Sequence, residues 1–212
     1  MSGEEYFNKA AYFKGKTSGY KLGYRLYNSK VRWIPPMREV MHFKEGGNIL
    51  DIGCAYGFFL KFLPSSFRKY GVEISRSAAA QAKLNNPKGN IAGGDFLKKR
   101  YPENFFDIIT AFEVLEHLPK LRETIEKMHT LLKKDGYLIA SFPVVESFLE
   151  RKWFTQFDES HINPSDKVLS DLGKKFIVIN RKFTFDCFSL IIISKFRIFP
   201  VHQSYFIVAR KK

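Results

Sequence analysis

From residue 48 onward, short apolar runs alternate with longer stretches in which apolar residues recur every three or four positions. The short runs are typical of buried strands and the longer ones of amphipathic helices. The predicted strands are residues 48–52, 70–74, 107–112 and 136–142, and the predicted helices are 58–63, 78–84 and 120–133. Strands that alternate with helices favour parallel crossover connections. The pattern therefore predicts an α/β fold with a doubly wound, mostly parallel sheet.

The alternation stops after Pro143. Residues 144–165 are predicted to form an irregular insert, and a helix is expected over 165–172. Two β-rich runs follow, at 176–185 and 205–209, with no clear helix between them. We expect these runs to form an antiparallel hairpin at the sheet edge.

Residues 1–46 differ from the rest, being aromatic and basic, with Tyr20, Tyr24 and Tyr27 at helical spacing. Pro35-Pro36 interrupts this region, and a short helix is expected over 37–43. No repeat or low-complexity linker divides the 212 residues. We expect one compact domain, with residues 1–46 as an N-terminal helical and aromatic cap on a core of residues 47–212.

Cysteine usage and charge limit the function classes. Cys54 and Cys187 are far apart and give neither a disulfide framework nor metal-ligand spacing, so no metal is expected. The first residues lack the pattern of a secretory signal, and the apolar stretch 183–200 contains charges, so we expect a cytoplasmic, soluble protein without a membrane span. The formal charge of +14 is scattered in short clusters. It is compatible with nucleic acid, anionic lipid, a phosphorylated substrate or no specific partner.

The sharpest local motif is Asp51-Ile-Gly53-Cys54-Ala55-Tyr-Gly57, where the first strand meets its helix. Small residues at such a junction let a ligand approach the backbone. Glu73 lies 22 positions after Asp51 (73 − 51), at the end of the second strand. An acidic residue there can accept hydrogen bonds from both hydroxyls of a ribose.

On these residues the chain resembles the class I S-adenosylmethionine-dependent methyltransferases, over about residues 48–143. The resemblance implies a Rossmann-like fold and S-adenosylmethionine as cofactor. The family's motif has the form Asp/Glu-x-Gly-x-Gly-x-Gly, and Ala55 replaces its middle glycine. The added methyl group is small, and we expect it to be tolerated. The implied cofactor-binding residues are Asp51, Gly53, Cys54, Ala55, Gly57, Glu73, Ile74, Asp95, Phe96, Phe112 and Glu113.

Two further segments extend the resemblance. Residues 92–96 resemble the loop after the third strand, where Asp95 would contact the adenine amine and Phe96 would cover the ring. Residues 112–118 resemble the fourth-strand motif of the subgroup that methylates small molecules, with its Glu-His pair opening the next helix. Phe112 and Glu113 would then lie near the methionine end.

Two histidines are candidate catalytic residues. His117 could act as a general base toward the acceptor, or hydrogen-bond locally at the helix start. His161 lies in Asp-Glu-Ser-His, which resembles an Asp-x-Thr-His segment of the same subgroup, and could face the transfer pocket or be an ordinary loop histidine. Tyr6, Tyr12, Phe13 and Tyr20 are similar to an N-terminal segment that could form a lid over the site, or could pack as a helix face.

The sequence thus favours a methyltransferase that acts on a small-molecule, sugar or lipid-linked acceptor, with O-methylation preferred. The Asn/Asp-Pro-Pro-aromatic motif of base N-methylating enzymes is replaced by residues 112–115. An RNA substrate stays open through the basic charge, because phosphate contacts would supply affinity. A cofactor-binding scaffold without catalysis is a second alternative. An NAD-dependent oxidoreductase fits poorly, because Asp51 precedes the glycines where a dinucleotide would place its pyrophosphate.

Overall fold

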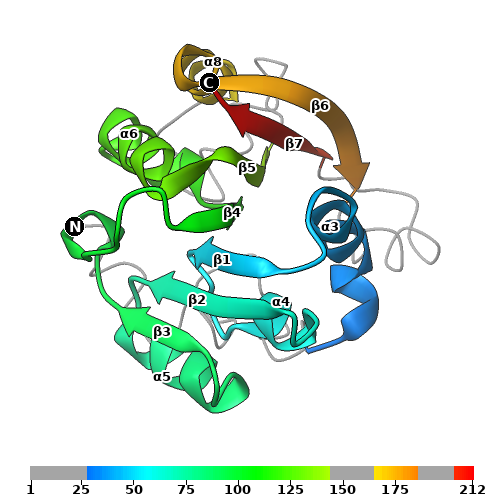
Figure 1. Cartoon of the computed structure of the whole chain (residues 1–212), viewed down its shortest axis with the longest axis vertical. Helices are drawn as coiled ribbons and strands as arrows, with labels where there is room; N and C mark the ends of the chain where they lie inside the picture. The colour runs from blue at the N-terminus through cyan, green and yellow to red at the C-terminus, as the bar shows by residue number, and fades with distance from the viewer. Residues whose placement is uncertain (1–27, 144–164, 186–202) are drawn as a thin grey trace, which may run out of the picture.

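The computed structural model describes residues 28–143, 165–185 and 203–212. Its centre is a seven-stranded sheet with the order β3-β2-β1-β4-β5-β7-β6, which runs from β3 at the bottom of Figure 1 to β6 at the top. The strands are β1 (Gly47–Ile52), β2 (Phe67–Glu73), β3 (Asn90–Gly93), β4 (Phe106–Phe112), β5 (Leu132–Pro143), β6 (Phe176–Phe185) and β7 (Gln203–Lys211).

The strand directions confirm the predicted sheet. β1 pairs in parallel with both β2 and β4, β2 with β3, and β4 with β5. β7 is antiparallel to both β5 and β6 and lies between them. The chain is therefore a Rossmann-like α/β protein with an antiparallel C-terminal pair at one edge, as the sequence predicts.

The helices divide between the two faces of the sheet, because each hides one apolar stripe. The helices are α3 (Lys30–Phe43), α4 (Phe58–Phe62), α5 (Arg76–Asn85), α6 (Leu121–Leu131) and α8 (Ser165–Lys175), with 3₁₀ turns η2 (Phe96–Lys98) and η3 (Leu115–His117). α3, α4 and α5 pack around Ile49, Ile108 and Ile139, while α6 and α8 pack around Leu50, Ile109 and Leu138. Alternate strand residues thus point to two separate apolar cores.

The N-terminal part of the prediction was wrong about the prolines. One helix, α3, runs from Lys30 to Phe43 and contains both Pro35 and Pro36. A proline inside a helix removes a hydrogen bond and costs about 3 kcal/mol. Trp33, Met37 and Val40 are buried at helical spacing on the same core, and this packing outweighs the lost bonds. Residues 6–27, with the tyrosines proposed for a lid, lie outside the described residues.

The segments around the fourth strand also differ in detail. The Glu116-His117 pair belongs to the 3₁₀ turn η3, and the next α-helix begins at Leu121. Ala92 and Gly93 end strand β3 instead of belonging to the loop after it. The predicted insert at 144–165 lies almost wholly outside the described residues. Within the described ranges, no helix is both long and apolar enough to cross a bilayer.

Candidate cofactor and methyl-transfer site

The turn after β1 has an unusual backbone. Gly53, Ala55 and Gly57 have φ values of +72°, +48° and +69°, in the left-handed region. Glycine adopts this region freely, whereas alanine is strained there by roughly 1–2 kcal/mol. A Cβ on Gly53 would also clash with Cγ2 of Val114. Packing and backbone geometry therefore both favour glycine at position 53.

Neighbouring elements hold this turn in place. The backbone N–H groups of Gly53 and Cys54 donate to the Val72 carbonyl of β2, at 2.8 and 3.2 Å. At the C-terminal end of α5, the side-chain amide of Asn86 donates to the Gly57 carbonyl at 2.9 Å, and that of Asn85 to the Tyr56 carbonyl at 2.8 Å. The turn is thus fixed by β2 on one side and by α5 on the other.

Glu73, the last residue of β2, faces this turn. Its Oε2 accepts a hydrogen bond from the Ala55 N–H at 2.8 Å, and its Oε1 accepts one from the Ser75 N–H at 2.9 Å. The carboxyl group is buried, which raises its pKa, while N–H donors from Ser75, Ala55 and Ile74 act in the opposite direction. A carboxylate offers about four acceptor positions, so Glu73 keeps capacity to accept from another donor.

Asp51 lies beside Glu73 in the adjacent strand and is also buried. Its Oδ1 accepts a hydrogen bond from the Thr110 hydroxyl of β4 at 2.8 Å. Burial raises the pKa of Asp51 to about 7, the Thr110 hydroxyl opposes this shift, and the charge of Glu73 adds to it. Burial, and to a smaller extent the charges of Asp51 and Glu73, raise the pKa of the Cys54 thiol well above its ordinary value. The carboxyl ends of β1 and β2 therefore form a concentrated acidic site.

The loop after β3 carries the next two candidate residues. Asp95 is half-buried, and its Oδ1 accepts from the Leu97 N–H at 2.9 Å, which starts the turn η2. The Phe96 ring is buried. Lys127 of α6 fixes this loop from behind, because its Nζ donates to the carbonyls of Phe96 and Leu97 at 2.8 and 2.9 Å.

Lys127 has further contacts with the same loop. Its Nζ also donates to the Lys99 carbonyl and lies 4.8 Å from the centroid of the Phe96 ring. Burial lowers the pKa of Lys127, while the nearby charge of Asp95 raises it. An ammonium group has three N–H donors, and three carbonyls of this loop use them. Lys127 thereby holds Asp95 and Phe96 at the site.

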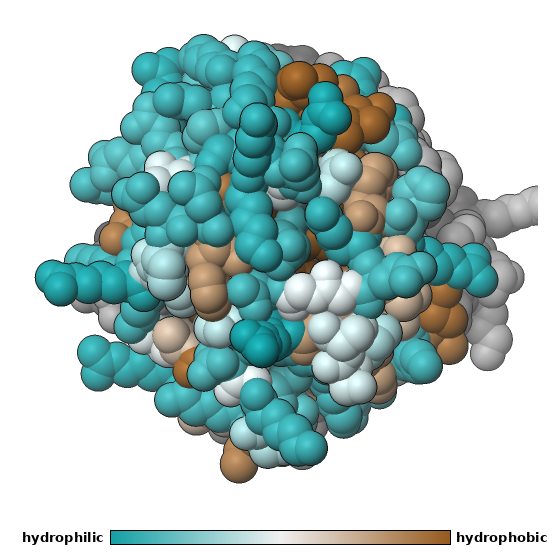
Figure 2. All heavy atoms as spheres, viewed as in Figure 1, coloured by the Kyte–Doolittle hydropathy of each residue, from teal (hydrophilic) through white to brown (hydrophobic). Residues whose placement is uncertain are grey.

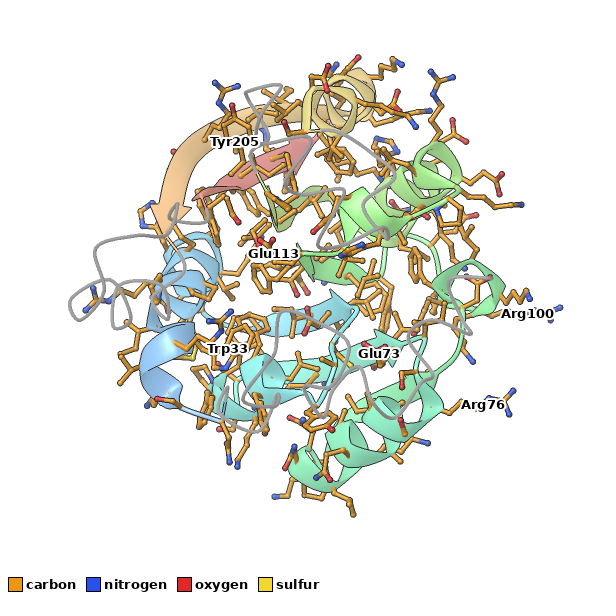
Figure 3. The ribbon with its side chains drawn as sticks, turned by 180° about the vertical axis from the view of Figure 1, so that it is seen from behind. Trp33, Glu73, Arg76, Arg100, Glu113 and Tyr205 are labelled. Atoms are coloured by element: carbon orange, nitrogen blue, oxygen red, sulfur yellow. The ribbon has the colours of Figure 1, made fainter. Side chains whose placement is uncertain are left out.

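Glu113 marks the carboxyl end of β4. Its φ of +54° is rare for a residue other than glycine, and such backbone strain gathers at functional sites. Its N–H donates to the Ser141 carbonyl at 2.8 Å, and its Oε1 accepts from the Ser141 hydroxyl at 2.7 Å. Figure 3 shows Glu73 at the end of β2 and Glu113 just beyond β4, on either side of β1.

Phe112, one residue before Glu113, is part of an aromatic cluster. Its ring is 5.0 Å from that of Phe59 and 6.1 Å from that of Phe206, and Trp33 of α3 lies 6.4 Å away. Helix α3, where Figure 3 labels Trp33, is thereby joined to β4 and β7 close to the site. These aromatic rings thus form an apolar wall next to the carboxyl ends of β1 and β2, where the acidic side chains lie.

Of the two candidate histidines, the structure describes His117. His117 lies in η3 with a side chain that is 10% exposed, and its Nε2 is 3.7 Å from Oε1 of buried Glu116. His161 lies outside the described residues. Within the described ranges, no group of three or more His, Cys, Asp or Glu side chains is arranged to hold a metal ion.

Sequence reasoning missed the residues that support the site. Thr110 holds Asp51, Ser75 holds Glu73 and caps α5, and Asn85 and Asn86 hold the glycine-containing turn. Ser75 could have been found as a serine immediately before a helical pattern. The contacts of Thr110 and the two asparagines join residues 29 to 59 positions apart, and no local pattern reveals them.

Comparison with known proteins identifies the class. The sequence model of a methyltransferase domain family matches residues 27–169, well over half of the chain. The match contains β1 to β5 and every described candidate site residue. The chain therefore belongs to this methyltransferase domain family.

Curated relatives agree over the same region. The chain is 30% identical over 131 residues to 24-methylenesterol C-methyltransferase 3 of Arabidopsis thaliana, covering 58% of this chain and 35% of that protein. It is 33% identical over 106 residues to a ubiquinone biosynthesis O-methyltransferase of Glaesserella parasuis, covering 45% of each chain. The chain thus spans about a third of the length of the sterol methyltransferases it matches.

Solved structures share the fold. The PH0226 protein of Pyrococcus horikoshii has a TM-score of 0.70 at 18% identity, covering 98% of this chain and 99% of that one. Phosphoethanolamine N-methyltransferase 2 of Haemonchus contortus, solved with S-adenosyl-L-methionine, has a TM-score of 0.70 at 13% identity, covering all of this chain and 60% of that one. At such low identity, these likenesses establish the fold.

Proposed function

We propose that this chain binds S-adenosylmethionine at the carboxyl ends of β1, β2 and β4 and transfers its methyl group to a small-molecule acceptor. The observation that carries the proposal is the buried Glu73 carboxylate, which is bonded to the Ala55 N–H and retains acceptor capacity beside a left-handed turn. The solved neighbours bound to S-adenosylmethionine and S-adenosylhomocysteine, and the membership of a methyltransferase family, support it.

The chemistry of the described side chains fits such a cofactor. Glu73 would accept hydrogen bonds from the ribose hydroxyls, with Ile74 next to it. Asp95 would accept from the adenine amine, and Phe96 would pack beside the base. The backbone of the turn formed by Gly53, Cys54, Ala55 and Gly57 would lie against the ligand. The methionine end of the cofactor would lie near Asp51, Phe112 and Glu113.

When bound, the cofactor supplies an electrophilic methyl group on a sulfonium. The protein's task is then to hold the acceptor in line and to exclude water, and such positioning can contribute roughly 7–11 kcal/mol. The buried carboxyl group of Asp51 is suited to a cationic ligand, because a nearby positive charge favours its ionised form. No covalent intermediate with the protein is required.

For the acceptor, we propose a small apolar molecule, with transfer to oxygen as the first choice. The relatives are named for 24-methylenesterol and for ubiquinone biosynthesis, and their names include both C- and O-methyltransferases. Transfer to a hydroxyl needs a base, and His117 is the described candidate, with His161 as the second. A general base in reach contributes about 10²–10⁴-fold to the rate.

Titration calorimetry with S-adenosylmethionine and S-adenosylhomocysteine tests the cofactor step. Saturable binding of both that is weakened by Glu73→Gln supports the proposal. No heat and no thermal stabilisation with either ligand would overturn it. Transfer of radiolabelled methyl groups to panels of sterols, quinol precursors and RNA then separates the small-molecule acceptor from RNA. Binding without transfer to any acceptor would favour the catalytically inactive scaffold.

A further inference from the structure

Strand β6 forms the outer edge of the sheet beyond β7 and exposes three aliphatic side chains in a row. Ile177, Val178 and Ile179 are 46%, 38% and 47% exposed. Alternate residues of a strand point to opposite faces, so Ile177, which pairs with exposed Arg210, and Val178, which pairs with buried Ala209, are exposed on opposite faces of this edge. Figure 2 shows apolar atoms at the surface over β6, among hydrophilic ones.

Strand β6 also contains a β-bulge. Val178 pairs with Ala209 and Asn180 pairs with Val208, so Ile179 has no partner in β7. A bulge leaves one extra residue unpaired and bends the strand. Ile179 is therefore an additional exposed aliphatic residue next to Val178 on the open edge of the sheet.

Cations surround this row. Residues 172–185 contain four Lys or Arg, residues 203–212 contain three, and neither segment contains Asp or Glu. The two segments are joined, because the Lys212 N–H donates to the Lys175 carbonyl at 3.3 Å and the Lys212 Nζ donates to the Gly173 carbonyl at 2.6 Å. Arg210 is exposed and pairs directly with Ile177 across the two strands.

Only part of this charge is neutralised within the described residues. Lys174 donates to buried Asp171 at 2.7 Å, and Lys175 lies 3.6 Å from the exposed carboxylate of Glu126. An exposed ion pair such as Lys175–Glu126 is weak. The β6 edge, defined as Ile177, Val178 and Ile179 with Lys175, Arg210 and Lys212, is therefore an aliphatic strip along the open edge of the sheet, with side chains on both faces and cations beside it.

We propose that the β6 edge docks on the surface of an anionic lipid bilayer. Aliphatic side chains at the headgroup boundary with lysine and arginine beside them are the combination that such a surface binds. Protection of an edge strand is the alternative explanation for this surface, and it accounts for only part of it. Lysines and a bulge protect an edge strand from pairing, but protection does not explain three exposed aliphatic residues.

Other occupants fit the β6 edge less well. A second copy paired through β6 would bring two rows of like charges together, which is destabilising. Nucleic acid would use the cations, but its phosphate backbone offers nothing to the aliphatic strip. The lipid surface alone uses both components. This docking surface goes beyond the proposed methyl transfer and does not depend on it.

Sedimentation of the full chain with phospholipid vesicles tests the docking surface. We expect binding to phosphatidylcholine vesicles that contain about a third phosphatidylserine, and little binding to pure phosphatidylcholine. Binding should fall as salt shortens the Debye length from about 30 Å to about 3 Å. Each cation at a lipid surface changes partitioning about fivefold, so Lys175→Gln with Arg210→Gln should weaken it about 25-fold.

A second variant tests the apolar part. Ile177→Thr with Ile179→Thr keeps β-branched side chains and should lower vesicle binding, most clearly at high salt. The matched control is Lys83→Gln, Leu84→Ser and Lys88→Gln, which removes an exposed leucine and two exposed cations on and just after α5, near the opposite edge of the sheet. Its vesicle binding should equal that of the parent protein.

The outcomes that overturn the proposal are specific. They are failure of the parent chain to bind anionic vesicles, equal loss in the α5 control, or binding of a transfer-RNA probe without vesicle binding. Thermal unfolding shows whether each variant folds. Because Arg210 and Lys175 are surface residues, the charge variant tests the β6 edge even if the Ile177 and Ile179 variant does not fold.

Discussion

Oε2 of Glu73 accepts a hydrogen bond from the backbone N–H of Ala55 at 2.8 Å. This bond joins the end of β2 to the left-handed turn after β1, so the shape of the turn and the position of the carboxylate depend on each other. A ligand that binds Glu73 therefore meets a turn that is already in place. Preorganisation of this kind lowers the cost of ordering on binding.

Replacing Glu73 with Gln tests this relationship. The glutamine side chain has one acceptor oxygen where the carboxylate has two, so the N–H of either Ala55 or Ser75 loses its acceptor. The proposed ribose also loses a charged hydrogen-bond partner. We expect the dissociation constant for S-adenosylhomocysteine to rise by about thirtyfold or more, since a hydrogen bond to a charged group contributes about 2 kcal/mol. Calorimetry measures this change. The exposed variant Glu103→Gln is the control, and equal affinity in the two variants would contradict the role of Glu73.

Replacing Ala55 with Gly tests the strain in the turn. Relief of left-handed strain should exceed the extra entropy of glycine in the unfolded chain, and the free energy of unfolding should rise by up to about 1 kcal/mol. Cofactor affinity should be retained. Urea unfolding provides the measurement. Asn104→Gly is a matched control at φ +51°, where asparagine already tolerates the conformation and a smaller gain is expected.

Lys127→Met tests the support of the loop after β3. The variant keeps most of the apolar stem but leaves the carbonyls of Phe96 and Leu97 without their donor. We expect stability to fall by about 1–3 kcal/mol and S-adenosylhomocysteine to bind more weakly. Inosine-containing analogues of the cofactor should lose less affinity than the adenine form, because the Asp95 contact is the one displaced. Equal losses for both ligands would assign Lys127 a structural role only, and exposed Lys83→Met is the control.

The pKa of Asp51 gives a prediction for pH dependence. Because it is raised from 3.8 to about 7, the native state holds a proton that the unfolded chain releases between about pH 4 and pH 7. Stability linked to this group is thus present below about pH 4 and is lost as the pH rises to about 7. Asp51→Asn should be more stable than the parent protein at pH 8, by at most roughly 4 kcal/mol, and similar near pH 4.

Urea unfolding at several pH values checks this prediction. The exposed variant Asp135→Asn should show no such pH-dependent difference from the parent protein. A parallel pH dependence for the parent and the Asp51→Asn variant would mean that Asp51 is ionised throughout. The same variant should also weaken cofactor binding, so stability and binding are expected to change in opposite directions at pH 8.

His117→Asn separates a base from a positioning residue. If His117 accepts the proton of the acceptor, turnover should fall by about 10²-fold or more while the affinity for S-adenosylhomocysteine is unchanged. The rate should also lose its dependence on the ionisation of a group near neutral pH. A variant with lowered affinity and an unaltered pH profile would instead assign His117 to the packing of η3.

The parallel core could be predicted from the sequence because its signals are local. Strand β1 was expected at 48–52 and spans Gly47–Ile52, and α6 was expected at 120–133 and spans Leu121–Leu131. Periodicity gives these positions because each element hides one face. The continuous helix through Pro35 and Pro36 could not be predicted, because the burial of Trp33 and Met37 on a distant sheet outweighs the local preference.

The candidate site likewise contains residues that the sequence predicts and residues that it does not. Asp51, Glu73 and the glycines stand in a fixed motif that follows strands, so their convergence at one edge of the sheet follows from topology. Lys127 is 31 residues from Phe96 and occupies an ordinary polar position of an amphipathic helix. Its bond to that loop depends on the packing of α6 against η2, which no spacing in the sequence records.

The position of β7 has a consequence for the order of events in folding. This strand follows β6 in the chain but lies between β5 and β6, and its residues from 203 onward pair with both. A nascent chain that has not yet emerged beyond residue 203 leaves β5 with an open edge and β6 with no partner in the sheet. Translation must therefore proceed past β7 before all seven strands can pair. Chains interrupted earlier leave the unpaired backbone groups of β5 and β6 exposed to chaperones and proteases.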